Sequence, residues 1–143
     1  MILTKDYIVG LVDGEGSFTV QVRHPIKSTK VKRRARIEPR FFLKLVEKDR
    51  AILDKLKEYF GCGQVYYQKD RRPNHQNCCR YEVSNRKNLD QIILPFFRKN
   101  KLKLISKKKD FDLLCKIMKA IREGEHLTDQ GLSRLFKIKQ QMH

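Results

Sequence analysis

Two stretches of the chain alternate between apolar and polar residues, as strands with one buried face do. They are Ser17–His24 and Arg36–Glu47, and a basic loop that opens at Pro25 separates them. The apolar side is formed by Phe18, Val20, Val22, Ile37, Phe41, Leu43 and Leu45. A second pair, Gln64–Asp70 and Cys79–Ser84, flanks a turn-rich loop. The sequence therefore predicts two β-hairpins, each with one apolar and one polar face.

Apolar residues at helical spacing occur before, between and after these hairpins. We expect helices over Thr4–Val12, Asp49–Phe60, Asn88–Leu94 and Ser106–Arg122, followed by a last helix capped by Thr128. Thr4 and Asp49 suit N-caps, Gly14, Gly16 and Gly61 mark helix ends, and Pro95 stops or bends its helix. This order predicts an α+β fold with an αββαββα core, an antiparallel four-stranded saddle sheet and C-terminal helices. We expect a single domain over residues 1–143.

The charge of the chain points to a polyanionic partner. Its 33 Lys and Arg residues against 16 Asp and Glu residues leave a formal net charge of +17. Such a charge attracts nucleic acid, anionic membranes or acidic proteins. A membrane-surface helix would concentrate its cations opposite an apolar stripe, whereas these cations follow strand-like segments. The pattern therefore favours nucleic acid over a membrane surface.

Several other classes of protein are disfavoured by the residues present. No run approaches the roughly 18 apolar residues that span a bilayer, and the N-terminus lacks a signal-peptide layout. We therefore expect a soluble intracellular protein, cytoplasmic in a prokaryote or else organellar. The four cysteines lack CxxC spacing and are expected to be reduced thiols. The four histidines have no partner at a motif spacing, so we expect them to be non-catalytic.

One nine-residue string, IVGLVDGEG at Ile8–Gly16, carries candidate chemistry. Gly10 and Gly14 are four residues apart, so they share one helix face and allow another backbone to approach closely. Asp13 and Glu15 stand at the expected end of this helix, where an acid is unfavourable by about 0.3–1 kcal/mol. A bound divalent cation would offset that cost, because carboxylate oxygens suit Mg²⁺. The alternative is that both acids are simple turn residues.

The whole string resembles the motif of the LAGLIDADG homing endonucleases, and Ser17 and Phe18 extend the match. The resemblance implies a motif helix that packs on a second copy through Gly10, Asp13 and Gly14. It implies that Glu15 binds Mg²⁺, or another divalent cation such as Mn²⁺, with the Gly14 carbonyl as a further ligand. Glu15 replaces the Asp of the name-giving string.

The single copy of the motif has its own consequence. Each acid serves one DNA strand in the family, so one motif implies a homodimer that makes a double-strand break. Such a dimer would cut a near-palindromic duplex site and leave short 3′ overhangs. The saddle of two sheets would lie in the major groove.

The resemblance also suggests supporting residues. Glu47 would help to position water in the active site, and Lys107 would sit near the scissile phosphate, with Lys108 as the second choice. Arg and Gln side chains suit guanine and adenine, and Glu38 and Glu82 suit cytosine. The expected DNA contacts are Thr19, Gln21, Arg23, Arg33, Arg34, Arg36, Glu38, Arg40, Lys44, Tyr66, Gln68, Arg71, Arg72, Arg80, Glu82 and Lys108.

Two other functions are compatible with the same basic sheet. The first is an RNA-binding maturase that helps its host intron to fold, with or without DNA cleavage. The second is a DNA-binding protein of the same fold that has lost catalysis. The second predicts a missing acid at the eighth motif position, whereas Glu15 is present.

Overall fold

The computed structural model describes residues 1–23, 26–27, 32–33 and 36–143. Arg34 lies outside the described residues, as does the side chain of Arg33, so their expected DNA contacts remain predictions. The elements are α1 (Lys5–Glu15), β1 (Gly16–Arg23), β2 (Ile26–Lys27), β3 (Lys32–Arg33), β4 (Arg36–Val46), the 3₁₀-helix η1 (Glu47–Asp49), α2 (Arg50–Phe60), β5 (Gln64–Gln68), β6 (Cys78–Val83), α3 (Arg86–Asn88), the π-helix η2 (Leu89–Ile93), α4 (Leu94–Lys99), α5 (Ile105–Arg122), the 3₁₀-helix η3 (Glu125–Leu127) and α6 (Asp129–Lys139). The predicted α+β fold with an αββαββα core is confirmed.

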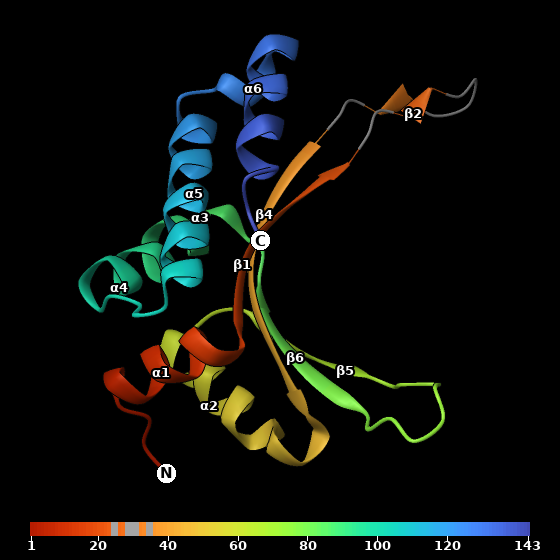
Figure 1. Ribbon diagram of the computed structural model, residues 1–143, viewed down its shortest axis with the longest axis vertical. Helices are drawn as coiled ribbons and strands as arrows, with labels where there is room; N and C mark the ends of the chain where they lie inside the picture. The colour runs from red at the N-terminus through yellow and green to blue at the C-terminus, as the bar shows by residue number, and fades with distance from the viewer. Residues whose placement is uncertain (24–25, 28–31, 34–35) are drawn as a thin grey trace.

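One curved antiparallel sheet organises the molecule. Its four strands lie in the order β1-β4-β6-β5, so the long strand β4 joins the two hairpins. Gly16 pairs with Leu43 at the start of β1, and the register continues to Arg23 opposite Arg36. The helices gather on one side of this sheet, and its concave side carries none of the described helices (Figure 1). The alternation of buried and exposed residues along β1, β4 and β6 follows from this one-sided cover.

Aromatic side chains hold the sheet against the helices. The ring of Phe18 on β1 lies 5.2 Å from that of Phe41, 5.4 Å from Phe97 and 5.3 Å from Phe111, between ring centroids. Phe97 belongs to α4 and Phe111 to α5, so one ring connects two strands with two helices. Such offset and edge-to-face pairs stabilise a core by about 0.5–1.5 kcal/mol each beyond their burial.

The first helix is longer than the sequence predicted. Thr4 caps it by accepting the Tyr7 N–H at 3.1 Å, as expected. The helix then continues through Gly14 to Glu15, beyond the predicted end at Val12. Gly16 is the C-cap, and a Cβ there would lie 2.6 Å from Val12 Cγ1. Gly14 is thus a helical residue, and only Gly16 is needed where the chain turns into β1.

Two expectations about later helix termini are wrong, namely that Pro95 stops its helix and that the Asp49 side chain caps α2. Pro95 does not stop its helix, because helical residues run from Arg86 to Lys99 with the π-helix η2 just before α4. A helix tolerates proline in its first turn, and Pro95 lies in the first turn of α4. The wider π turn before it lets α4 begin at Leu94. Asp49 precedes α2 but makes no side-chain capping hydrogen bond. The expected caps at Gly61 and Thr128 are confirmed.

A membrane-spanning helix is not found in the described part of the chain, because no helix there is both long and apolar enough.

Candidate active site and nucleic-acid interface

The junction of α1 and β1 presents the candidate catalytic acid. Ile8 and Val12 are fully buried and fix the inner face of α1 against the core, whereas Gly14 and Glu15 are exposed. Glu15 is the last helical residue, so its carboxylate stands beside the helix end, where backbone carbonyls lack helical partners. The site therefore concentrates oxygen acceptors at one exposed point, the kind of ligand that a hard divalent cation prefers.

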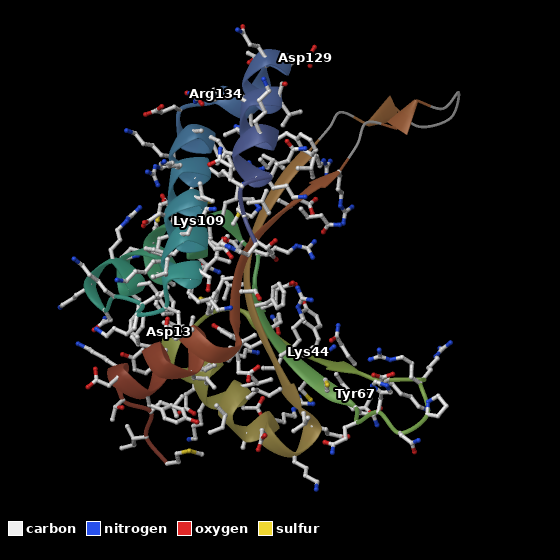
Figure 2. The ribbon with its side chains drawn as sticks, viewed as in Figure 1. Asp13, Lys44, Tyr67, Lys109, Asp129 and Arg134 are labelled. Atoms are coloured by element: carbon white, nitrogen blue, oxygen red, sulfur yellow. The ribbon has the colours of Figure 1, made fainter. Side chains whose placement is uncertain are left out.

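Asp13 has a different partner from Glu15. Its side chain is only 7% exposed, and its two oxygens accept the Lys103 N–H at 3.1 and 2.9 Å and the Leu104 N–H at 3.2 Å. These N–H groups directly precede α5, where a negative charge is favourable. In Figure 2, Asp13 lies on the side of α1 that faces the near end of α5. Within the chain, Asp13 thus ties the motif helix to α5, while its expected role in dimer contacts remains a prediction.

The structure separates the two candidate lysines. Lys107 donates a hydrogen bond from Nζ to the carbonyl of Gly16, the residue that follows Glu15. Lys108 instead lines a hollow of about 340 Å³ with Phe97, Leu102 and Phe111, between α4 and α5. Lys107 is therefore the lysine beside the candidate acid, and the contact of Lys108 with DNA remains a prediction.

The pairing of β1 with β4 does not bring Glu47 next to Glu15 and Lys107. Leu43 lies opposite Gly16, and Glu47 follows four residues later in η1, exposed to solvent. At about 3.3 Å per residue, that places Glu47 about 13 Å further along the direction of β4. Its backbone N–H donates to the Asn77 carbonyl at 2.9 Å, so this corner is tied to the second hairpin. A role for Glu47 in positioning water remains a prediction.

The face of α1 that carries Gly10 and Gly14 is open. Both glycines are exposed, and a Cβ added at either one would meet no atom within 4 Å. A single chain therefore has no steric need for glycine at these positions, although each glycine costs a helix about 0.5–1 kcal/mol relative to alanine. The close approach of another molecule to this face would explain why glycine stands at both positions.

The polar positions predicted for DNA contact share the concave side of the sheet. Strand pairing sets Thr19 opposite Arg40 and Gln21 opposite Glu38 on the first hairpin, and Tyr66 opposite Arg80 on the second. The intervening residues of β1, β4 and β6 are the buried ones. These positions therefore lie on one face, and they are Thr19, Gln21, Arg23, Arg36, Glu38, Arg40, Lys44, Tyr66, Gln68, Arg80 and Glu82. Their contacts with DNA remain predictions.

Charged side chains on this face pair with one another, both along a strand and across strands. Glu38 forms ion pairs at 3.2 Å with both Arg23 and Arg40. Glu82 lies 2.8 Å from Arg80 and 3.7 Å from Arg40. The two glutamates and three arginines therefore form one continuous chain of alternating charge.

Phe42 belongs to the same face and was missed by the sequence analysis. The guanidinium carbon of Arg80 lies 3.6 Å from the centre of its ring. Alternation alone could have found Phe42, because it shares its parity with Arg40 and Lys44 on β4.

The tip of the second hairpin is also basic. Lys44, Gln68 and Arg71 line a hollow of about 260 Å³ together with Cys78. Arg72 turns back to Asp70, with 2.7 Å between Nη2 and Oδ2. The hydrogen bonds from Arg72 hold the pKa of the Asp70 carboxyl well below its usual range. Arg71 is therefore more available to a partner than Arg72.

Comparison with known proteins assigns these features to a family. The model of the LAGLIDADG endonucleases matches residues 8–118. The solved homing endonuclease I-TnaI is 32% identical with a TM-score of 0.82, over 100% of this chain and 90% of that one. I-LtrWI bound to its target DNA is 26% identical with a TM-score of 0.86, over 99% of this chain and 44% of that one.

Curated relatives are also endonucleases, and this chain matches only part of their length. A probable intron-encoded DNA endonuclease of Mycosarcoma maydis is 37% identical over 111 residues, 78% of this chain but only 35% of the relative. Homing endonuclease I-ApeII of Aeropyrum pernix is 28% identical over 116 residues, 81% of this chain and 63% of that protein. The family model, which matches well over half of the chain, decides the assignment: this chain is a member of the LAGLIDADG endonuclease family.

Proposed function

We propose that the chain is a site-specific homing endonuclease that acts as a homodimer, with one such domain per chain. It would make a metal-dependent double-strand break with 3′ overhangs in a long, near-palindromic duplex site. The observation that carries this proposal is the position of Glu15. Its exposed carboxylate ends a helix whose glycine face is open, and Lys107 is hydrogen-bonded to the neighbouring Gly16.

The open face of α1 supports the proposal that the chain forms a homodimer. Gly10 and Gly14 let two α1 helices cross closely about a two-fold axis, which brings one Glu15 from each chain to the same place. One acid serves one DNA strand, so both copies are needed for a double-strand break. The two-fold axis also explains why the proposed site is near-palindromic.

The residues at the junction fit a divalent cation only when they are combined with other ligands. No group of three His, Cys, Asp or Glu side chains that could hold a metal is found among the described residues. Glu15 and the Gly14 carbonyl would hold Mg²⁺ or Mn²⁺ together with the partner's acid and phosphate oxygens. The bound cation would supply Lewis-acid stabilisation of charge and a water of lowered pKa.

The other residues position and stabilise the DNA. Lys107 would place a positive charge where negative charge develops on the scissile phosphate. The concave sheet would hold the duplex, with Arg71 among the cations at its rim. Glu47 would act from η1, just after the end of β4, by ordering water.

Glu15→Gln tests the proposal directly. A duplex selected by the wild-type chain from a randomised pool is cloned into a supercoiled plasmid, and cleavage is followed with Mg²⁺. We expect the variant to bind as the wild type does but to cut at least about 100-fold more slowly. Glu58→Gln, which removes an exposed acid on α2, is the control and should cut normally. Equal cutting by Glu15→Gln would refute the catalytic assignment.

The two alternative functions give different results in the same assays. A non-catalytic DNA-binding protein would leave the plasmid supercoiled at every Mg²⁺ concentration. An intron maturase would bind its host intron RNA more tightly than the selected duplex in a filter assay. Tight, selective binding of the duplex together with Mg²⁺-dependent cleavage supports the endonuclease over both.

A further inference from the structure

The concave face carries its arginines in a linked arrangement rather than as independent side chains. Glu38 uses one carboxylate oxygen for Arg23 and the other for Arg40, both at 3.2 Å. Glu82 uses a single oxygen, Oε1, for Arg80 at 2.8 Å and for Arg40 at 3.7 Å. Arg40 is thus held from both sides by the two glutamates.

Burial makes this arrangement more constrained than ordinary surface ion pairs. The side chain of Glu82 is only 14% exposed, and those of Arg80 and Arg40 are 21% and 25% exposed. A carboxylate surrounded in this way has little surface left for a base edge, whereas an arginine carries five N–H donors and commits only some of them. Glu38 is 26% exposed, about as much as Arg40, but both of its oxygens are already paired with arginines. The arginines keep N–H donors that no carboxylate binds, whereas Glu38 has committed both oxygens and Glu82 is largely covered.

Phe42 holds Arg80, the last arginine in this row of alternating charges. It pairs with Glu82 across β4 and β6, and the guanidinium of Arg80 covers its ring at 3.6 Å. A guanidinium that stacks on a ring and is also held by a carboxylate loses most of its rotational freedom. Arg80 thus has two supports, Glu82 and Phe42, and Arg40 also has two, Glu38 and the shared Glu82.

We propose that Glu38, Glu82 and Phe42 are positioning residues that set the base preference of the concave face by holding Arg23, Arg40 and Arg80, and that the two glutamates do not themselves contact cytosine. This inference rests on the proposed function, since it assigns specificity to the DNA-binding face. It replaces the expectation that Glu38 and Glu82 accept a hydrogen bond from a base. It also makes the specificity of the three arginines interdependent.

The proposal predicts a pattern over three variants. Glu38→Gln should disturb Arg23 and Arg40, Glu82→Gln should disturb Arg40 and Arg80, and Phe42→Leu should disturb Arg80 alone. Arg23 pairs through Nε, whereas Arg40 and Arg80 pair through their Nη groups. In the free protein, the pairs are therefore read from both the Nε–Hε and the Nη–Hη NMR signals, assigned with Arg23→Ala, Arg40→Ala and Arg80→Ala. Glu58→Gln on α2 is the control and should shift none of the three. Unchanged arginine signals in folded Glu38→Gln and Glu82→Gln would overturn the proposal without any reference to DNA.

Base preference is measured by sequencing duplexes bound from a randomised pool. Each alanine variant defines the positions that its arginine reads, where it should lose about 5-fold to 150-fold of discrimination. Glu82→Gln should lose about twofold to tenfold at both the Arg40 and the Arg80 positions. Glu82→Asp, which keeps the charge but shortens the side chain, should keep more of this preference.

The outcomes separate this inference from the proposed function. Loss of a cytosine preference at a position that no arginine variant affects would show that the glutamate itself reads a base, and would refute the positioning role. If the wild type selects no duplex at all, the proposed function fails, and the NMR pattern still decides whether the three arginines are held as described.

Discussion

The carboxylate of Asp13 accepts the backbone N–H of Lys103 with both of its oxygens, at 3.1 and 2.9 Å, across 90 residues of sequence. Lys107, one turn further along, donates to the Gly16 carbonyl. The end of α1 and the start of α5 are therefore linked twice, on either side of Glu15. The geometry of the candidate site depends on this double link.

Asp13→Asn should destabilise the fold. The amide cannot accept two N–H groups with two oxygens, and it loses the favourable charge beside the start of α5. We expect the free energy of unfolding to fall by about 1–3 kcal/mol in urea denaturation. Asp6→Asn, which changes an exposed aspartate in the first turn of the same helix, should cost less than about 1 kcal/mol. Similar losses in the two variants would contradict the role given to Asp13.

Gly10→Ala should separate assembly from folding. Because a Cβ at this position meets open space, alanine should stabilise the isolated chain by about 0.5–1 kcal/mol through its higher helix propensity. The same Cβ should hold two α1 helices apart, so association measured by sedimentation should weaken. Gly16→Ala is the contrasting variant and should destabilise the chain itself, since its Cβ would meet Val12. Unaltered association of Gly10→Ala would place the interface elsewhere.

Lys107→Ala and Lys108→Ala form a matched pair. Lys107 is bonded beside Glu15, whereas Lys108 lines the hollow between α4 and α5. Cleavage under single-turnover conditions should therefore slow by about 100-fold or more in Lys107→Ala and change little in Lys108→Ala. Binding of the uncleaved duplex, measured in Ca²⁺, serves as the control for both. The reverse order of effects would move the active-site lysine to position 108.

Binding should depend steeply on salt. A dimer with a net charge of +17 per chain would contact on the order of ten phosphates, and each contact releases counterions. The affinity should then fall by about 10³-fold to 10⁵-fold between about 50 and about 200 mM salt. A titration of the Kd against salt concentration measures the slope, and a nearly flat slope would contradict a phosphate-dominated interface.

The sheet could be predicted from the sequence because its signal is local. Period-two alternation around Phe18 and Phe41 fixes which face of β1 and β4 is buried, and the concave face follows from it. The end of α1 was misjudged because Gly14 was treated as a breaker, although a helix tolerates an internal glycine at a cost of about 1 kcal/mol. Pro95 does not stop its helix for a related reason, since a π turn before it lets the helix continue.

The rest of the site depends on contacts between distant residues. Nothing near Asp13 in the sequence indicates Lys103 as its partner, because the contact exists only when α5 packs beside α1. The pairing of Glu82 with Arg40 requires the register of β4 against β6, which two separate hairpin patterns do not give. The motif therefore identified Glu15 from the sequence alone, whereas the contacts around Glu15 could be found only in the folded structure.

The spacing of side chains along β1 also fixes how far each one lies from the end of α1. Residues on one face of a strand are about 6.6 Å apart, close to two base-pair steps of about 3.4 Å. The outward positions from Ser17 to Arg23 thus span about six such steps from the end of α1. Inserting one residue into β1 would turn its buried side outward and ruin the core, whereas inserting two would preserve the core and move the outer side chains by about two base pairs relative to the cut. A change in the length of β1 that keeps the protein folded should therefore be an even number of residues.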